Sequence, residues 1–595
     1  MTRGRHGGTI LLLAIVAITA LAVLALADET EASWSGEPLP AWGNDWYITQ
    51  DTVYTDETIR LDGNIHVTPP FTLSLDGSTV IFNCSYEGQH GINVWWGAVL
   101  YINDSASNQG VVRSNTSSER WDFNSDGEVY LNNVDLKDVY YGIWNWNTYL
   151  YMEGCTLDST IYGIMSLADA HVGNTTINVH WDDWYWGVGY VECLGLLAQY
   201  GDYSLHNLDI NMKVDINGTY NSSSIYSDYY MYGLYLYNAN VGKLEPDRNK
   251  EFSISMDLDA EIWSYYETTG YVRFNNYFWI HAIYMGGDTV CRAINDVDID
   301  IDQDVTCVAN NATRGAWLRM YNYQEYLYSS ISSSGEAPSE VSGITMDGFG
   351  AVPHTMGEVY AVDEYWYCSA FEIRDGDGAQ PGDAVTEFHD IVVSNSKYDY
   401  VFYPPRYGEW MMYDCTFSNL EANRVLDLYY CDMDLSVSEN EFVGITALGD
   451  YTQLFRVYRT EGEVLFNNNT FSDIEGWRLF YIYYPDERVY FQNNLVDENV
   501  QWDHAYDSWF YVYENQDRVT FRWNTITDSV FIEGMIYGRY TRDKLVFEGN
   551  TVEDNEFNGY MLYTYRNYND VDVVENHMGW NTGPLLENDY VYGRG

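Results

Sequence analysis

The chain has 595 residues and a formal net charge of −59 at pH 7, because 88 acidic residues stand against only 29 basic ones. A protein this acidic is repelled by nucleic acid and by anionic membranes, which excludes nucleic acid as a partner. Hydrophobic residues make up 46% and aromatic residues 17% of the sequence, so the chain is not disordered by composition. The acid-rich, lysine-poor composition also attracts divalent cations and favours a halophilic source, where salt screens the repulsion.

Residues 1–27 have the pattern of a segment that directs export. Arg3 and Arg5 precede an uninterrupted apolar or small stretch, and Ala25-Leu26-Ala27 is typical of a signal cleavage site. The stretch is also long enough to span a bilayer, so the segment is either a signal peptide or an N-terminal membrane anchor. Both alternatives predict an extracellular or cell-surface protein that contacts the membrane only through this segment.

The rest of the chain divides by the regularity of its strand pattern. Residues 28–45 are polar with Gly and Pro, and are predicted to be a linker. Residues 46–330 form a predicted N-terminal β-helix region with short alternating stretches and Asp-Gly turns, which becomes less regular after about residue 180, where long loop insertions are expected. Residues 331–385 are predicted to be an irregular insertion. Residues 386–595 are predicted to be a regular C-terminal β-helix, which either carries an atypical cap or is truncated from a longer one.

One phrase recurs six times between Leu435 and Met578, for example as Val489-Tyr-Phe-Gln-Asn-Asn494-Leu-Val. A repeat of this size, made of short strands and turns, is typical of a solenoid. The last asparagine of each copy is predicted to form a corner in the left-handed conformation and to hydrogen-bond along the stack as a structural ladder. This ladder comprises Asn440, Asn469, Asn494, Asn524, Asn550 and Asn576, which are 29, 25, 30, 26 and 26 residues apart.

A column of tyrosines accompanies the ladder. A tyrosine follows an aliphatic residue in each repeat, as in Val457-Tyr458, so strand alternation predicts aliphatic residues inside and tyrosines outside. An outer row of tyrosines can bind sugar rings; the alternative is that aromatic residues favour strand surfaces and stack on one another. The column begins at Tyr430, and the candidate carbohydrate-binding residues are Tyr458, Tyr483, Tyr513, Tyr537 and Tyr563.

The repeat and its asparagine ladder resemble those of the right-handed parallel β-helix family, which includes pectate-lyase-like enzymes and exported microbial cell-surface repeat proteins. The predicted fold class is therefore all-β: a right-handed parallel β-helix, or solenoid, with irregular loop insertions in the middle. The resemblance implies the fold and no particular activity, because function depends on the sites that a fold carries.

Two acidic loops are candidate calcium sites. The stretch from Asp122 to Glu128 places oxygen ligands on alternate residues, with Gly127 for the bend, as in the first half of a calcium loop. The twelfth position is Asn133 instead of a bidentate glutamate, so an Asp-Gly turn before the next strand is the alternative. Calcium is the expected ion and no other cofactor is predicted; the candidate ligands are Asp122, Asn124, Asp126, Glu128, Asp375 and Asp377.

Eight cysteines in an exported chain permit disulfides. Cys415 with Cys431, and Cys291 with Cys307, are candidate pairs between neighbouring coils. Cys155 and Cys415 also occupy the position that asparagine takes in the ladder, which predicts small buried side chains there.

The sequence contains no complete set of catalytic motifs. Polygalacturonase-like signatures are not present as a set, and Trp502-Asp503-His504, which is similar to a motif of pectate lyases, lacks its companion arginine motif. We therefore predict an exported cell-surface β-helix protein, structural or adhesive and calcium-stabilised, with a polysaccharide or cell-surface glycan as its partner. The alternatives are a secreted polysaccharide lyase or glycoside hydrolase, with its site in the less regular middle, and an exported metal-delivery or maturation protein. The oligomeric state stays open.

Overall fold

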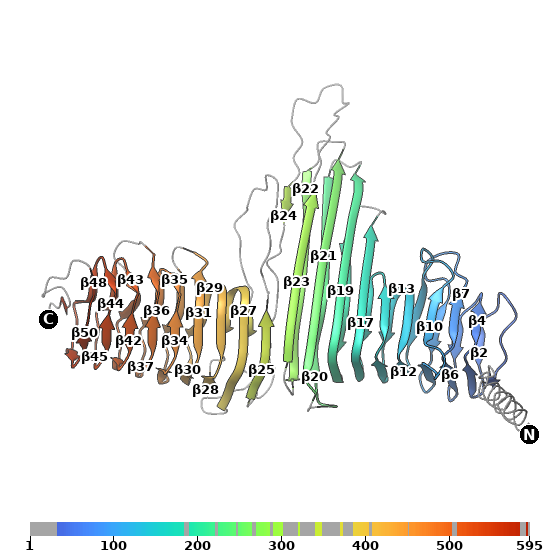
Figure 1. Ribbon diagram of the computed structural model, residues 1–595, viewed down its shortest axis with the longest axis horizontal. Helices are drawn as coiled ribbons and strands as arrows, with labels where there is room; N and C mark the ends of the chain where they lie inside the picture. Colours follow the sequence, from blue (N-terminus) through green and yellow to red (C-terminus); the bar gives the residue numbers. More distant parts are fainter. Residues whose placement is uncertain are drawn as a thin grey trace, which may run out of the picture.

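The computed structural model describes residues 33–183, 190–220, 224–245, 248–264, 269–285, 289–300, 319–321, 340–347, 369–372, 385–403, 407–449, 452–502, 508–582 and 591–592. The regular elements of these residues are all β-strands. The strands stack along one long axis, with β2 (Trp46–Ile48) near one end and β50 (His577–Met578) near the other (Figure 1). The predicted fold class, an all-β parallel β-helix, is confirmed.

Each strand pairs in parallel with the strand that takes the same place in the next coil. For example, β33 (Val464–Asn467) pairs with β37 (Val489–Gln492), and β37 pairs with β41 (Val519–Arg522). Among the described strands, only β1 (Ser33–Ser35) pairs in the antiparallel sense, with β3 (Thr52–Thr55). β1 lies within the segment predicted to be a linker, and the first parallel strand begins at Trp46.

The N-terminal coils are built from short strands. Inward residues alternate with outward ones, so Leu73 and Leu75 of the strand Thr72–Asp76 are buried while Ser74 between them is partly exposed. These strands include β4 (Thr58–Leu61), β5 (Ile65–Val67), β6 (Thr72–Asp76), β7 (Thr79–Phe82), β8 (Gly91–Val94), β9 (Val99–Asn103), β10 (Gly110–Ser114), β11 (Trp121–Ser125), β12 (Glu128–Asn132), β13 (Val134–Asn145), β14 (Leu150–Glu153), β15 (Thr156–Ser159) and β16 (Tyr162–Ser166).

Several long strands in the middle of the chain rise far above the coils on either side (Figure 1). β19 and β21 stay paired from Leu208 opposite Phe252 to Tyr220 opposite Ser264. Long loop insertions are expected after residue 180, and much of the described part of this region is strand. The long strands are β17 (Ala170–Asp183), β18 (Tyr190–Gln199), β19 (Asp202–Tyr220), β20 (Ser224–Val241), β21 (Lys250–Ser264), β22 (Thr269–Met285) and β23 (Thr289–Asp300).

Regular coils continue after residue 385, and from residue 453 each full coil contains four short strands. The interior of this region is a continuous column of aromatic residues. Phe455, Phe480 and Phe510 follow one another in register, with ring centroids 4.8 and 5.5 Å apart. Burial of one such side chain contributes about 1.5–3 kcal/mol. The strands before residue 453 are β27 (Val385–Tyr403), β28 (Tyr407–Tyr413), β29 (Thr416–Tyr429), β30 (Asp432–Ser438) and β31 (Glu441–Ala447). The first two four-strand coils are β32 (Gln453–Tyr458), β33, β34 (Thr470–Ser472) and β35 (Glu475–Gly476), and then β36 (Arg478–Tyr483), β37, β38 (Leu495–Asp497) and β39 (Val500–Gln501). The next two are β40 (Phe510–Tyr513), β41, β42 (Thr525–Thr527) and β43 (Val530–Phe531), and then β44 (Gly534–Arg539), β45 (Leu545–Glu548), β46 (Thr551–Glu553) and β47 (Glu556–Phe557); β48 (Tyr560–Tyr565), β49 (Val571–Val574) and β50 follow.

The corners differ from the prediction in one respect. The left-handed residue is not the ladder asparagine but the residue before it, such as Asn493 with φ 54° and Trp523 with φ 57°. The bend at this residue turns the following asparagine inwards, where its amide meets the neighbouring coils. Asparagine is therefore selected at the ladder position for its buried amide and not for its backbone conformation.

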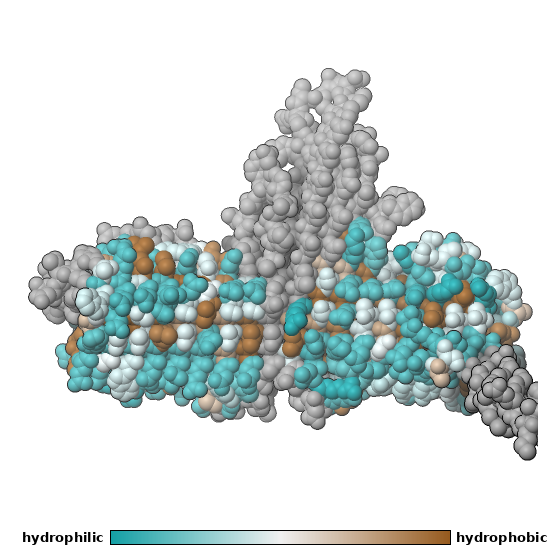
Figure 2. Space-filling view, in the orientation of Figure 1, coloured by the Kyte–Doolittle hydropathy of each residue, from teal (hydrophilic) through white to brown (hydrophobic). Residues whose placement is uncertain are grey.

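Within the described ranges, no helix has the length and apolar character that a membrane crossing requires. Hydrophilic residues cover most of the described surface in the view of Figure 2, and hydrophobic ones appear in short patches.

Candidate functional site

The outward side of one sheet of the C-terminal coils carries the predicted tyrosines; we call it the tyrosine face. The aliphatic partners Val457, Ile482 and Val512 are buried, while Tyr458 and Tyr483 beside them are partly exposed, as alternation predicts. The tyrosine face comprises the outward side chains of β29, β32, β36, β40, β44 and β48 and of the corner residue that follows each strand.

The strand register divides the predicted tyrosine column in two. Tyr458, Tyr483 and Tyr513 are in register with one another, but the next residue in their row is Arg539. Tyr537 and Tyr563 belong to the adjacent row, in register with Tyr511. Tyr430 is likewise outside the column, because Tyr429 is the residue opposite Tyr458. The predicted single column is therefore wrong for Tyr430, Tyr537 and Tyr563.

The buried side of the sheet explains this shift. Ile536 lies opposite Phe510, where it continues the row of Phe455 and Phe480. Gly538 then takes the place opposite Val512. An aliphatic–tyrosine pair thus occurs in each repeat, but two different interior rows supply the aliphatic residue.

The aligned tyrosines stack face to face. The ring centroids of Tyr458 and Tyr483 are 4.6 Å apart with planes 6° apart, and those of Tyr483 and Tyr513 are 5.0 Å apart with planes 7° apart. Both ring faces of Tyr483 are therefore covered by its neighbours, and its ring edge and hydroxyl group are left for solvent. This stack suits hydrogen bonding along a polymer better than stacking of sugar rings on the tyrosines.

Arginines are inserted between these tyrosines. The Arg459 guanidinium lies 5.3, 5.6 and 5.7 Å from the ring centroids of Tyr430, Tyr458 and Tyr484, and its Nη1 donates to the hydroxyl of Tyr430 at 2.7 Å. Such cation–π contacts contribute about 0.5–1 kcal/mol at exposed positions. They hold the guanidinium in place without neutralising its charge.

Arg539 is held in the same way in the later coils. Its guanidinium lies 5.6, 5.0 and 5.9 Å from the rings of Tyr513, Tyr540 and Tyr565. The hydrogen bond from Arg539 lowers the pKa of the Tyr540 hydroxyl. Arg566 lies 5.0 Å from the ring of Tyr565.

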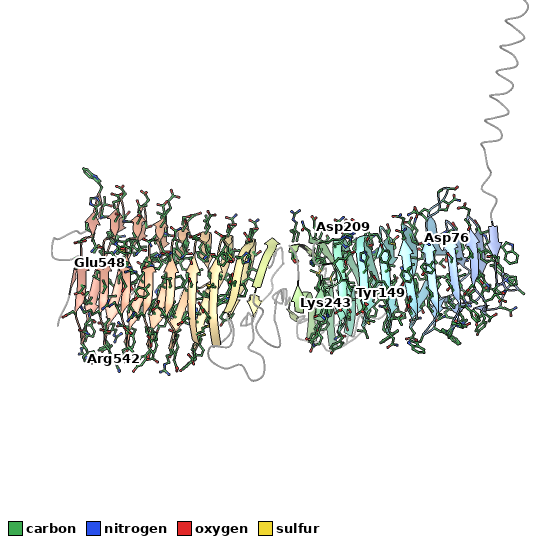
Figure 3. The ribbon with its side chains drawn as sticks, turned by 90° about the horizontal axis from the view of Figure 1, so that it is seen from below. Asp76, Tyr149, Asp209, Lys243, Arg542 and Glu548 are labelled. Atoms are coloured by element: carbon green, nitrogen blue, oxygen red, sulfur yellow. The ribbon has the colours of Figure 1, made fainter. Side chains whose placement is uncertain are left out.

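Two other arginines on or beside this face have carboxylate partners. Arg456 makes a bidentate pair with the buried carboxylate of Asp427, at 2.5 and 2.6 Å. Arg542, labelled in Figure 3, pairs with Glu514 at 3.1 Å. In the part of the chain that the structure describes, Arg459, Arg539 and Arg566 have no carboxylate within 4.0 Å. The tyrosine face thus presents three arginines without an ion pair on a strongly acidic protein.

The asparagine ladder lies inside the same coils. The Nδ2 group of Asn440 donates to Oδ1 of Asn469 at 3.0 Å, and Asn469 donates to Asn494 at the same distance. The chain of amides continues through Asn524 and Asn550 to Asn576. Cys415 precedes it, because its backbone N–H donates to Oδ1 of Asn440 at 3.0 Å. Cys415 is a free buried thiol, so the candidate disulfide between Cys415 and Cys431 is wrong; Cys307 lies outside the described residues.

A second ladder was missed in the sequence. Its members lie five residues after those of the first, and Asn555 donates to Asn581 at 3.2 Å in the same geometry. A serine interrupts the asparagines, which hides the pattern, although the constant offset of five residues was available as a signal. The second ladder comprises Asn499, Ser529, Asn555 and Asn581.

The structure does not gather the first set of predicted calcium ligands around one point. Asp122 and Asn124 are successive outward positions of the extended strand β11, about 7 Å apart along the strand. Asp126 accepts a hydrogen bond from Asn147, and Glu128 accepts one from the hydroxyl of Tyr130. One buried oxygen of Asp122 has no hydrogen-bond partner, and burial raises the pKa of this carboxyl. Calcium binding here stays a prediction, and Asp375 and Asp377 lie outside the described residues.

One group of potential metal ligands does come together elsewhere: Glu153, His171 and His206. These residues are 18 and 35 positions apart in the sequence, and no motif connects them. Only the pairing of three strands places them side by side.

No protein-family model matches the chain, and no curated protein is similar to it in sequence.

Proposed function

We propose that this chain is an exported cell-surface β-helix protein with a structural or adhesive role, and that its tyrosine face binds an anionic polysaccharide or cell-surface glycan. Export depends on the predicted role of residues 1–27. The likeness to pectate-lyase-like β-helix proteins belongs to this proposal and supports a polysaccharide as the ligand class.

The observation that carries the proposal is the set of Arg459, Arg539 and Arg566. Guanidinium groups make strong bidentate hydrogen bonds to carboxylate and sulfate groups, and no carboxylate among the described residues lies within ion-pair distance of these three. They are spread over several coils, so they suit a polymer that lies along the axis. The tyrosine hydroxyls beside them can donate to sugar hydroxyl groups.

The fold supports a role as a rigid support. Neighbouring C-terminal coils are joined by parallel strand pairing and by a ladder of buried side chains, which a second ladder accompanies from Asn499 on. A solenoid of this kind is long and does not depend on one central core. Such a shape can hold a binding surface away from its attachment point.

The net charge of −59 repels an anionic ligand, and this repulsion predicts how the affinity for the glycan depends on salt. Repulsion from the whole protein acts over a longer range than contacts with three arginines, so salt screens it first. We expect affinity for the glycan to rise on going from very low to moderate ionic strength and then to fall as the local contacts are also screened.

The test is a binding and turnover measurement on arrays of acidic polysaccharides, with the full chain in moderate salt with calcium. The variant Arg459→Gln/Arg539→Gln/Arg566→Gln should lose at least tenfold in affinity. A control variant with the same charge change in the N-terminal coils should bind like the unchanged protein; it carries Arg60→Gln, Arg113→Gln and Arg120→Gln. Equal losses in both variants would show that only net charge matters and would refute a specific site.

The same array tests the enzyme alternative. Release of unsaturated or reducing ends from a retained polysaccharide would contradict a purely adhesive role and support a lyase or hydrolase. Retention without release supports adhesion.

A further inference from the structure

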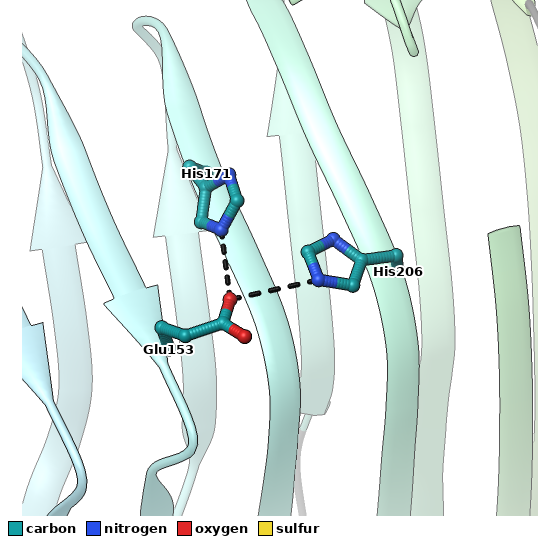
Figure 4. Close-up of side chains that lie close together, drawn as sticks. All are labelled: Glu153, His171 and His206. Atoms are coloured by element: carbon teal, nitrogen blue, oxygen red, sulfur yellow. Dashed lines mark hydrogen bonds and ion pairs between the residues drawn. The ribbon is translucent and has the colours of Figure 1, made fainter. Parts of the chain in front are cut away.

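Three neighbouring strands bring Glu153, His171 and His206 together at the start of the long-strand region (Figure 4). Glu153 ends β14, His171 lies near the start of β17, and His206 lies near the start of β19. β14 pairs with β17 and β17 pairs with β19, so the three residues tie together three consecutive levels of the stack.

Gly173 provides the space in which these side chains meet. It lies opposite Glu153 on one side and opposite His206 on the other. A Cβ atom at this position would collide with the imidazole of His206 and the carboxylate of Glu153. The absence of a side chain on the middle strand therefore allows the two outer side chains to reach each other.

The three ligand atoms have the separations of a metal site. Oε2 of Glu153 lies 2.8 Å from Nε2 of His171 and 3.5 Å from Nε2 of His206, and all three lie within 4.8 Å of one another. Zinc binds nitrogen and carboxylate oxygen at about 2.0–2.2 Å in tetrahedral geometry, which puts ligand atoms about 3.3 Å apart. Small side-chain movements would bring these atoms to that spacing.

The surroundings hold the ligands in position. The ring of Tyr151 stacks on that of His171 with centroids 4.5 Å apart and planes 9° apart. Nδ2 of Asn174 donates to the other oxygen of Glu153. Both imidazoles are more than nine-tenths buried, and Nδ1 of His206 has no hydrogen-bond partner among the residues that the structure describes. Rings that are packed in this way lose little freedom when they bind an ion.

A cationic side chain reaches the same nitrogen of His206. Nη1 of Arg248 lies 2.5 Å from Nε2 of His206, and Nε of Arg248 lies 3.2 Å from a carboxylate oxygen of Glu245. Glu245 also accepts a hydrogen bond from Ser204 at 2.8 Å. Arg248 is about half exposed, so its head group can leave this position without disturbing the core.

We propose that Glu153, His171 and His206 form a binding site for a divalent transition-metal ion of the zinc class, and that Arg248 competes with this ion for His206. Two imidazoles and one carboxylate are ligands that zinc and cobalt prefer, whereas calcium takes oxygen ligands. Three protein ligands leave a fourth position for water or a further group. A bound ion would join three levels of the stack at the boundary between short and long strands.

Titration of the full chain with Co²⁺ tests the proposal, because tetrahedral coordination with nitrogen ligands gives strong visible absorption that octahedral binding to scattered carboxylates does not. We expect one such site, displaced by Zn²⁺. His206→Ala and Gly173→Ala should each weaken binding at least tenfold. Arg248→Gln should bind more tightly than the unchanged protein, because it removes the competing cation.

His180→Ala is the matched control. His180 lies on β17 like His171 and also pairs with a carboxylate, Asp215 at 2.7 Å, but this pair has no third metal ligand among the described residues. It should leave the cobalt spectrum unchanged, and circular dichroism should show that every variant is folded. A folded His206→Ala or Gly173→Ala protein with the same affinity and spectrum as the unchanged protein would overturn the site. Weaker binding by Arg248→Gln would overturn the competition.

Discussion

Replacement of Asn494 by alanine is the most direct test of what holds the coils together. The Nδ2 group of Asn494 donates to the carbonyl of Phe466 and to Oδ1 of Asn524, each at 3.1 Å. Its Oδ1 accepts from the backbone N–H and the Nδ2 of Asn469, at 2.9 and 3.0 Å. All four hydrogen bonds are buried, so water cannot replace the lost groups.

The expected cost follows from these contacts. A buried polar group left without a partner costs about 1–3 kcal/mol, and each further lost hydrogen bond costs about 0.5–1.5 kcal/mol. The backbone N–H of Asn469 loses its acceptor, while Asn524 keeps its hydrogen bond from the backbone N–H of Asn494. We therefore expect Asn494→Ala to lower the free energy of unfolding by about 3–5 kcal/mol.

The preceding residue supplies the matched control. Asn493 is exposed, has φ 54°, and its side chain donates only to Asn467 at the surface. Asn493→Gly keeps the left-handed conformation available and should change the free energy of unfolding by no more than about 0.5 kcal/mol. The substitutions at these two adjacent asparagines are thus expected to lower the free energy of unfolding by very different amounts.

Urea unfolding followed by circular dichroism and by tryptophan fluorescence measures both variants. Because coils can unfold locally, native-state hydrogen exchange at Asn469 should accompany it, and this amide should lose protection in Asn494→Ala. A loss below about 1 kcal/mol, or equal losses in the two variants, would refute the view that the buried amide and not the corner stabilises the repeat.

Three further predictions concern other buried groups. Asp427→Asn removes one half of a buried bidentate pair with Arg456 and should cost about 2–4 kcal/mol in urea unfolding; a loss below 1 kcal/mol would contradict this. Burial raises the folded-state pKa of Asp122, so its contribution to stability is full below the unfolded pKa of about 3.9 and is lost as pH rises through the folded pKa. Asp122→Asn should therefore be more stable than the unchanged protein at pH 7 and similar to it at pH 3, and a rise in melting temperature with calcium that this variant lacks would support calcium binding at Asp122. Burial raises the pKa of the Cys415 thiol to about 12, so iodoacetamide at pH 8 should label it only after denaturation; complete labelling of the folded protein would be the contrary result.

The sequence by itself determined the architecture of the C-terminal coils. A strand pattern of period two fixes which residues face inwards, and a repeat of 25 to 30 residues fixes how often the pattern returns. Val489 and Phe491 are buried for this reason. An asparagine takes the place of Asn494 in each of the six repeats. These features are local, so they can be recognised without knowing which strands are neighbours.

Register was not determined in this way. The row that Tyr537 joins depends on which interior residue of the preceding coil lies opposite its neighbour Ile536. Ile536 lies opposite Phe510 and not opposite Val512, so Tyr537 continues the row of Tyr511 and not that of Tyr513. The two arrangements have the same local pattern of alternating residues. Packing between coils decided between them, and with it the position of Arg539 among the tyrosines.

The group of Glu153, His171 and His206 depended most on the tertiary structure. Its members come from separate strands, and the feature that lets them meet is a missing side chain at Gly173. No spacing in the sequence shows that these positions share a row, because strand pairing and not chain distance sets which residues are adjacent in a parallel sheet. The sequence therefore determined how each coil is built, and the stacking of coils decided which side chains meet.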